Sequence, residues 1–179
     1  MREQALGELA AVVGDRHVIV DALEPFAHDA TFMDGELIAA VLPGTTSEVS
    51  DVMRVCHRLE IPVVARGAGT SLVGGSVPLG GGIVLSLERM DGIEIDTGSV
   101  CAIAGAGAIT SRIQEQAGVQ GLMYPPDPAS AQMSSIGGNV ACNSGGPSCL
   151  KYGVTADYGA QVEDAPKSAT ETTGSGLAK

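Results

Sequence analysis

Two segments in the first third of the chain repeat apolar residues with the 3.6-residue period of an amphipathic helix. The first spans residues 3–13 and ends before Gly14, and the second spans residues 49–59. Thr45 and Glu48 stand three residues apart where the second segment begins, and this spacing predicts a capping box. The apolar faces consist of Leu6, Leu9, Ala10 and Val13 in the first helix, and Val49, Val52, Met53, Cys56 and Leu59 in the second.

Short apolar runs have the length and the flanking residues of strands. They are expected at residues 37–42, 62–65, 83–87, 92–95 and 100–104. A helix separates the first two strands, so residues 37–65 predict one right-handed βαβ unit. The last two are joined by Asp-Thr-Gly-Ser, which predicts a hairpin. Residues 109–117 predict a third helix closed by Gly118, and residues 15–36 predict a loop.

The stretch from Pro62 to Glu88 is unusually rich in glycine. Up to Leu87 it contains no Asp or Glu, although the chain has 21 acidic residues, and its only charge is Arg66. Glycine costs backbone entropy in a plain structural segment, so this density indicates tight turns or a close approach to another group. Successive backbone N–H groups in such turns form a concave anion site. The stretch therefore predicts a phosphate-binding loop that begins at Arg66.

A plain glycine-rich surface loop is the alternative to this interpretation. Known phosphate-binding motifs narrow down the kind of phosphate-binding loop that the sequence predicts. A Walker A loop needs a lysine where the chain has Gly75, which excludes a P-loop NTPase. A Rossmann fingerprint matches Gly67-x-Gly69 after a strand, with Glu88 about 20 residues later. That fold needs a helix on the last glycine, and Pro78 with its neighbouring glycines opposes one. The favoured interpretation is a loop between strands of a different nucleotide fold, with an NAD-binding Rossmann domain as the weaker alternative.

A second segment of similar character runs from Tyr124 to Thr155. Three prolines begin it in a rigid, extended conformation. No acidic residue lies between Pro128 and Ala156, and the apolar residues are too many for a disordered linker. Small side chains and exposed backbone donors are expected at Ser134, Ser135, Gly137, Gly138, Asn139, Asn143, Ser144, Gly145 and Gly146. Two such segments in an acidic chain predict two walls around one large anionic ligand, which fits a dinucleotide better than a single phosphate.

Composition limits the classes of function that remain. A net charge of −11 argues against nucleic acid or an anionic membrane surface as a partner. No apolar run reaches the ~20 residues of a membrane span, and the first residues lack the pattern of a secretory signal. The cysteines form no CxxC pair and no zinc spacing, so no metal site is predicted and a reducing cytoplasm is expected. Cys56 and Cys101 are expected in the core, and Cys142 and Cys149 beside a glycine loop.

The two glycine-rich segments together resemble a known family. The run RGAGTS with Gly74 and Gly75, the strand IVLSLERM, and PPDP followed by SSIGGNVACNSGGPSCLKYGVT are similar to the FAD-binding domain of FAD-linked oxidases. This is the PCMH-type, or vanillyl-alcohol oxidase, superfamily. Within it the resemblance is strongest to the group of the FAD-linked D subunit of glycolate oxidase and the D-lactate dehydrogenases. It covers residues 37–157.

The resemblance implies an α+β fold of two lobes that clasp an extended, non-covalently bound FAD. It implies that the loop from Arg66 holds the pyrophosphate through backbone N–H groups. It also implies that a second loop and the segment after it line the flavin. The implied cofactor-binding residues are Arg66, Gly67, Ala68, Gly69, Thr70, Ser71, Gly74, Gly75, Pro126, Asp127, Ser130, Ser135, Gly137, Gly138, Asn139, Asn143, Tyr152 and Gly153.

The chain is expected to divide into a helix and lead-in (1–36), a PCMH-type domain (37–158) and a polar tail, disordered or aberrant (159–179). Because the family continues with further strands and a substrate-binding cap, the domain is expected to be C-terminally incomplete and this chain alone inactive, with unknown catalytic residues. The implied reaction is hydride transfer from a small 2-hydroxy acid, such as glycolate or D-lactate, to flavin N5. The alternative is a non-catalytic FAD-binding fragment. Partner subunits of a glycolate-oxidase-like complex are expected in the cytoplasm, with the inner face of the membrane reached through them.

Overall fold

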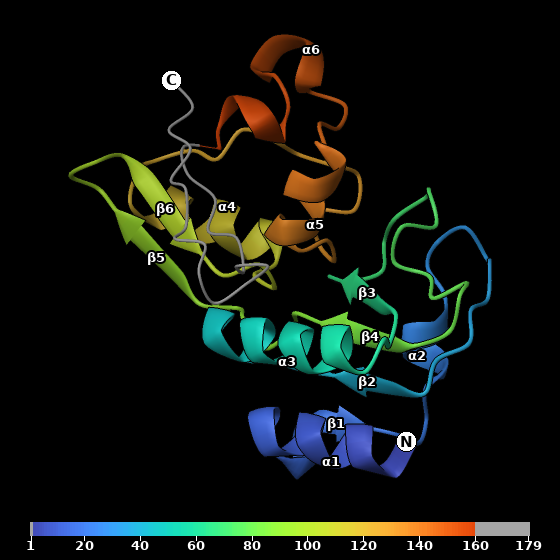
Figure 1. Cartoon of the computed structure of the whole chain (residues 1–179). Coiled ribbons are helices and arrows are strands. Elements are labelled where there is room, and N and C mark those ends of the chain that lie inside the picture. The colour runs from blue at the N-terminus through green and yellow to red at the C-terminus, as the bar shows by residue number, and fades with distance from the viewer. Residues whose placement is uncertain (1, 160–179) are drawn as a thin grey trace.

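The computed structural model describes residues 2–159. Its N-terminal lobe is built on a four-stranded sheet, which lies in the lower part of Figure 1. Its strands are β1 (Val18–Ile19), β2 (Ala39–Val41), β3 (Val63–Arg66) and β4 (Ile83–Ser86), in the order β1-β2-β4-β3. Its helices are α1 (Arg2–Val13), α2 (Glu24–Ala27) and α3 (Thr46–Arg58), with a 3-10 turn η1 (Asp15–His17). Strand β4 is parallel to both β2 and β3, and β1 is antiparallel at the edge.

Alternating residues of the sheet supply two separate cores. On one face, side chains of β2 and β4 pack with Leu9 and Val13 of α1 and with Val52 and Cys56 of α3. On the other face, Ala40, Leu42 and Val84 pack against partly buried residues around α2, which include Leu23 and Phe26. The predicted faces of α1 and α3 are therefore confirmed as core-facing, except at Met53, which was predicted on the apolar face of α3 and is 40% exposed. Burial raises the pKa of the Cys56 thiol to about 11.

Helix α3 begins with the predicted cap in a slightly altered form. The Glu48 N–H donates to Thr45 Oγ1 at 3.1 Å, as a capping box requires. The Glu48 carboxylate accepts from the N–H of Gly44 at 2.7 Å, one residue before the position of the ideal box. The end of β2 and the start of α3 are thereby fixed to each other.

The second lobe contains a two-stranded hairpin and a set of short helices. Strands β5 (Ile93–Asp96) and β6 (Cys101–Ala104) pair antiparallel, so the predicted hairpin is confirmed. They are followed by α4 (Thr110–Val119), α5 (Ile136–Cys142), α6 (Cys149–Tyr152) and the turn η2 (Thr155–Asp157). In Figure 1 these elements form the upper part of the molecule, above the end of β3.

Several predicted elements differ from the observed ones. The βαβ strands β2 and β3 are not neighbours, because β4 lies between them. The predicted loop over residues 15–36 contains β1 and α2, which are too short to show a period. Helix α4 continues through Gly118 to Val119. The segment expected to expose backbone donors after residue 134 instead forms α5.

The remaining sequence expectations concern cysteines, membranes and the tail. Cys101 is only partly buried, whereas Cys142 and Cys149 are exposed, and all four thiols are free. No helix within residues 2–159 has both the length and the apolar character needed to cross a membrane. The predicted tail begins at residue 159, and the rest of it, residues 160–179, lies outside the described residues.

Candidate functional site

The glycine loop, residues 67–76, leaves the carboxyl end of β3 at the top of the parallel part of the sheet. Ligands of such sheets bind beyond the carboxyl ends of the strands. Among the described residues 2–159, no protein acceptor receives a hydrogen bond from the successive backbone N–H groups of Gly67 to Leu72. Gly69 has a φ of 69° in the middle of this run. Free N–H groups around a left-handed residue are the pattern of a backbone anion site.

The N-terminus of α5 lies directly against this loop. A Cβ atom placed on Gly67 would stand less than 3.0 Å from Ser135 Oγ, and the N–H of Gly138 is also adjacent. Ser135 is the N-cap of α5 and accepts from the Gly138 N–H at 3.4 Å. Gly67 and Ser135 are 68 residues apart in the chain, and the fold brings the two glycine-rich segments together at these residues. The two segments predicted to form walls around one ligand therefore contact each other at this point.

A third segment, residues 105–108, joins the two lobes at the same place, and it was missing from the residues predicted from sequence. The carbonyls of Ala106 and Ala108 accept from the first N–H groups of α5, those of Gly137 and Ile136, at 2.9 and 2.8 Å. A Cβ atom on Gly107 would stand less than 3.0 Å from the carbonyl oxygen of Leu87, just after β4. The alternation of glycine and alanine in AGAGA, directly after a strand, was the available signal.

A buried polar network connects α5 to Thr110, the first residue of α4. The Thr110 N–H and hydroxyl both lie 3.0 Å from the carbonyl oxygen of Ser134. The Asn139 side chain, 2% exposed, donates from Nδ2 to Thr110 Oγ1 at 2.6 Å. Asn139 was predicted to line the flavin, and the structure gives its amide a partner inside the protein. Its observed contact fixes the orientation of the α5 N-terminal turn relative to α4.

Replacing Asn139 by alanine is expected to lower the free energy of unfolding by about 1–3 kcal/mol, because the change removes a buried donor and leaves a cavity. Urea unfolding measured by circular dichroism gives this quantity. Ser144→Ala is a matched control, since the hydrogen bonds of Ser144 in this structure use its backbone N–H and carbonyl. Equal unfolding midpoints for Asn139→Ala and the wild type would contradict the structural role of the network.

The other predicted residues of the second segment form a connected wall beyond α5. Asp127 donates its N–H to the Gly145 carbonyl at 3.2 Å, and the Pro126 carbonyl accepts from Gln114 Nε2 at 2.9 Å. Asn143 ends α5 in a left-handed conformation, and its Oδ1 accepts from the Ala156 N–H at 2.9 Å. Further connections run from the Ser130 carbonyl to the N–H of Ser134, and from the Tyr152 carbonyl, just before Gly153, to the hydroxyl of Tyr158.

Arg66 is buried, with 8% of its surface exposed. Its Nη1 donates to the carbonyl of His28 at 2.7 Å and its Nη2 to the carbonyl of Pro25 at 2.8 Å. Burial lowers the pKa of its guanidinium, against the opposing charges of Asp29 and Glu88. Two N–H donors of the guanidinium are therefore already occupied by backbone carbonyls. A contact between Arg66 and a phosphate stays a prediction.

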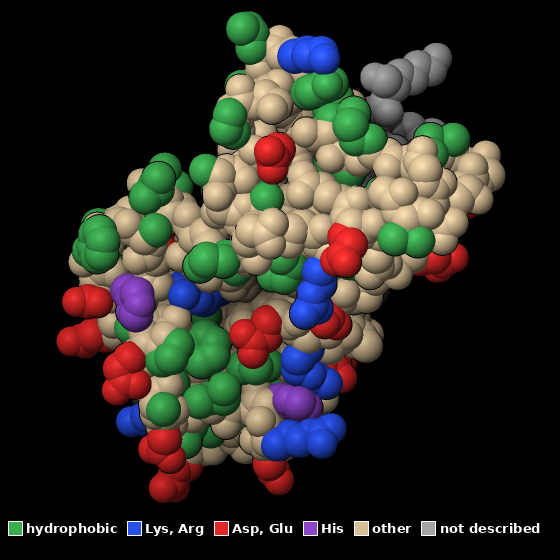
Figure 2. Space-filling view, turned by 180° about the vertical axis from the view of Figure 1, so that it is seen from behind, with side chains coloured by type: hydrophobic (Ala, Val, Ile, Leu, Met, Phe, Trp, Pro, Cys, Tyr) green, Lys and Arg blue, Asp and Glu red, His purple; other side chains and the backbone are tan. Residues whose placement is uncertain are grey.

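Charge is unevenly distributed over the two lobes. In Figure 2, acidic and basic side chains crowd the lower part of the molecule, and the upper part carries few. This distribution matches the scarcity of charged residues between residues 128 and 156. With Asp127 as its one acidic residue, this wall carries little charge to oppose the partial charges of the backbone N–H groups, which suits an anionic ligand.

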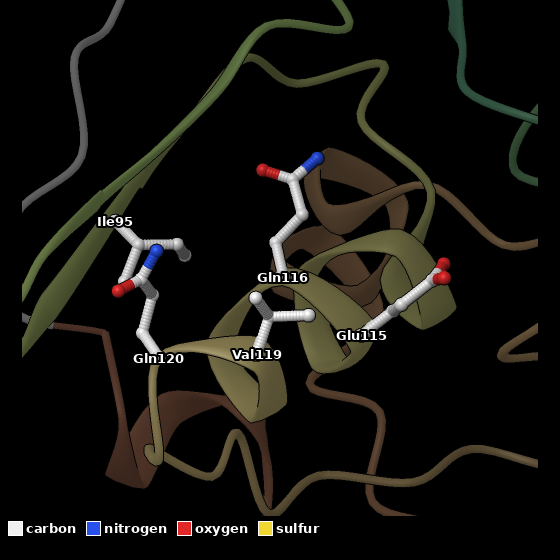
Figure 3. A pocket seen from close by; sticks show the side chains of 5 residues that line it. All are labelled: Ile95, Glu115, Gln116, Val119 and Gln120. Carbon is white, nitrogen blue, oxygen red and sulfur yellow. The ribbon is translucent and has the colours of Figure 1, made fainter.

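A separate hollow of about 280 Å³ lies between β5 and α4 (Figure 3). It is lined by Ile95, Glu115, Gln116, Val119 and Gln120, and Figure 3 shows their side chains around an open depression. None of these residues belongs to the glycine loop or to α5. No group of three or more metal-ligating side chains occurs within the part of the chain that the structure describes.

Comparisons with known proteins cover the part of the chain that contains the loop and α5. The family model described as FAD binding domain matches residues 38–164. Over 135 residues the chain is 43% identical to the glycolate oxidase subunit GlcD of Bacillus subtilis, covering 74% of this chain and 29% of that protein. Over 138 residues it is 41% identical to the D-lactate dehydrogenase of Anaerostipes hadrus, covering 75% and 29%. A solved alkyldihydroxyacetonephosphate synthase has a TM-score of 0.80 at 21% identity, over 91% of this chain and 33% of that one.

The fold is therefore the PCMH-type FAD-binding fold that the sequence predicted. The chain belongs to the FAD-binding domain family of FAD-linked oxidoreductases, and its cofactor is FAD. It spans about 29% of the length of the two relatives named above. The residues present fit this cofactor, because the free N–H groups of the glycine loop match the needs of a pyrophosphate.

Proposed function

We propose that this chain is the FAD-binding part of an oxidoreductase that acts on a small 2-hydroxy acid. The single observation that carries the proposal is the run of free N–H groups in the glycine loop, set against the N-terminus of α5. The choice of substrate class is supported by the relatives, which are named a glycolate oxidase subunit and a D-lactate dehydrogenase.

Each part of the site has a role in this proposal. The glycine loop binds the pyrophosphate, and Ser135 holds α5 against Gly67 so that the two walls stay together. The Asp127, Asn143, Tyr152 and Gly153 region forms the outer wall along the same ligand. When bound, the cofactor accepts a hydride from the substrate. The residues described here bind and orient the cofactor, and we assign none of them a catalytic role.

Non-covalent attachment is proposed because none of the three histidines belongs to the glycine loop or the segment from Tyr124 to Thr155. The names of the relatives also support partner subunits of a glycolate-oxidase-like complex. We place such a complex in the cytoplasm, where its partners would supply any contact with a membrane.

Purified protein is expected to bind FAD at close to one equivalent and to release it on denaturation. Equilibrium dialysis and flavin absorbance measure this, and NAD is the control ligand for the weaker Rossmann alternative. A protein that takes up NAD and not FAD would overturn the proposed function.

The substrate class requires a second measurement, which also separates the proposal from a non-catalytic FAD-binding fragment. The protein is mixed with FAD, glycolate or D-lactate, and a dye that accepts electrons from the flavin. Flavin-dependent dye reduction supports the oxidoreductase and would overturn the expectation that this chain alone is inactive. Stoichiometric FAD binding with no bleaching of the flavin by either acid agrees with that expectation and favours the binding fragment for this chain.

A further inference from the structure

Arg66 is the only charged residue between Pro62 and Leu87, yet its side-chain hydrogen bonds go to backbone outside the glycine loop. Its two carbonyl partners, Pro25 and His28, belong to α2 and the residue that follows it. Two acceptors fit the planar fork of a guanidinium, so the side chain is held in one orientation. If Arg66 left this position for a phosphate, both carbonyls would lose a charged donor inside the protein, at a cost in free energy.

The same guanidinium covers Gly69 in the first half of the glycine loop. A Cβ atom on Gly69 would stand less than 3.0 Å from Cζ and both terminal nitrogens of Arg66. Gly69 also has its φ at 69°, where a side chain adds strain. The glycine at this position therefore serves the approach of Arg66 as well as the turn. The guanidinium stands between the loop and α2, and it touches both.

A further link joins the same two segments beside Arg66. The Ala30 N–H donates to the Ser71 carbonyl at 3.1 Å, which ties the α2 side to the middle of the loop. Asp29, 4% exposed, accepts from the Thr31 N–H at 2.9 Å. Burial acts to raise the pKa of Asp29, but hydrogen bonds from Thr31, the nearby Gly74 amide and the charge of Arg66 bring it below its usual value. The buried positive charge thus has a buried negative charge nearby.

We propose that Arg66 is a positioning residue that clamps the glycine loop to the α2 segment and does not bind the phosphates itself. The clamp consists of Arg66, the Pro25 and His28 carbonyls, and Gly69. It presents the N–H groups of residues 67–72 in one arrangement before the cofactor arrives, so the loop loses less conformational entropy on binding. The anion is identified as FAD through the proposed function, whereas the ordering of the loop stands independently of it.

The test compares Arg66→Ala and Arg66→Lys by two measurements. Hydrogen–deuterium exchange without FAD follows the amides of Ala30, Gly35 and Val77, which are hydrogen bonded around the loop. Equilibrium dialysis gives the dissociation constant of FAD. Both variants are expected to raise exchange at these amides and to weaken FAD binding at least about tenfold. Lysine is expected to rescue little, because it keeps the charge but lacks the planar fork.

Arg89→Ala is the matched control. Arg89 also donates to a backbone carbonyl, that of Leu42, and also packs against a glycine, Gly44, but away from the loop. Its loss is expected to leave exchange at Ala30 and Val77 unchanged. Wild-type FAD affinity in Arg66→Lys, or weaker binding in Arg66→Ala with unchanged exchange, would overturn the clamp in favour of a direct charge contact.

The two proposals fail in different ways. If the wild type binds no FAD while both Arg66 variants raise exchange, the proposed function is wrong and the clamp is supported. If the wild type binds FAD and neither variant changes the exchange, the clamp is wrong and the proposed function stands. Should Arg66→Ala be unfolded, Arg66→Lys decides the matter through the same two measurements.

Discussion

Gly107→Ala is expected to destabilise the protein by at least about 2 kcal/mol, or to lower its melting temperature by roughly 4–8 °C. The added Cβ would stand less than 3.0 Å from the carbonyl oxygen and carbon of Leu87 and close to Glu88. These are backbone atoms, which cannot move aside as a flexible side chain does. The substitution forces apart the strand end of the N-terminal lobe and the segment that holds α5. Thermal unfolding followed by circular dichroism measures the change.

Gly92→Ala is the control for this prediction. Gly92 lies in the same part of the chain, accepts from the Gly105 N–H through its carbonyl, and has nothing within 4 Å of the position that a Cβ atom would occupy. The alanine is therefore expected to leave the melting temperature within about 2 °C of the wild type. Equal melting temperatures for Gly107→Ala and Gly92→Ala would contradict the close packing between the lobes.

Long periodic segments of the fold could be predicted from the sequence. Helix α3 had a clear apolar face, and the Thr45–Glu48 spacing marked its start. The face of α1 was less marked, and its buried residues include Ala5, which was outside the predicted face. Local sequence patterns could not predict the order of the strands, because the position of β4 between β2 and β3 depends on contacts between residues distant in the chain. Helix α5 was hidden by its composition, since two glycines lower the intrinsic helix propensity. Tertiary contacts of its first N–H groups with Ala106 and Ala108 stabilise it instead.

The candidate site divides in the same way. The glycine loop and the Ser135 region could be identified by their lack of acidic residues and their glycine content. Their contact at Gly67, and the supporting segment around Gly107, are products of the packing between lobes. A local pattern also could not show that Arg66 contacts the α2 segment, because its partner carbonyls precede it by about 40 residues. Backbone carbonyls have no signature in a sequence.

The effect of a negative charge on FAD binding is tested best at Gly75, because a side chain at this position adds charge without a steric clash. Gly69 is unsuitable, since any side chain there collides with Arg66 and meets a positive φ. Gly75 lies in the same loop with nothing within 4 Å of its Cβ position and without a positive φ. Gly75→Asp and Gly75→Asn add side chains of nearly equal size to that open position, so a difference between them reports charge.

Gly75→Asp is expected to weaken FAD binding roughly 30-fold relative to Gly75→Asn. A carboxylate about 7 Å from one phosphate charge, at an effective dielectric constant of 20, costs about 2 kcal/mol. Equilibrium dialysis at low salt measures both dissociation constants, and Gly75→Asn is expected to bind within about threefold of the wild type. The difference should shrink as salt rises, because screening weakens repulsion between partly exposed charges. Equal FAD affinities for the two variants at low salt would place the pyrophosphate away from Gly75, and with it the predicted run of contacts along the second half of the loop.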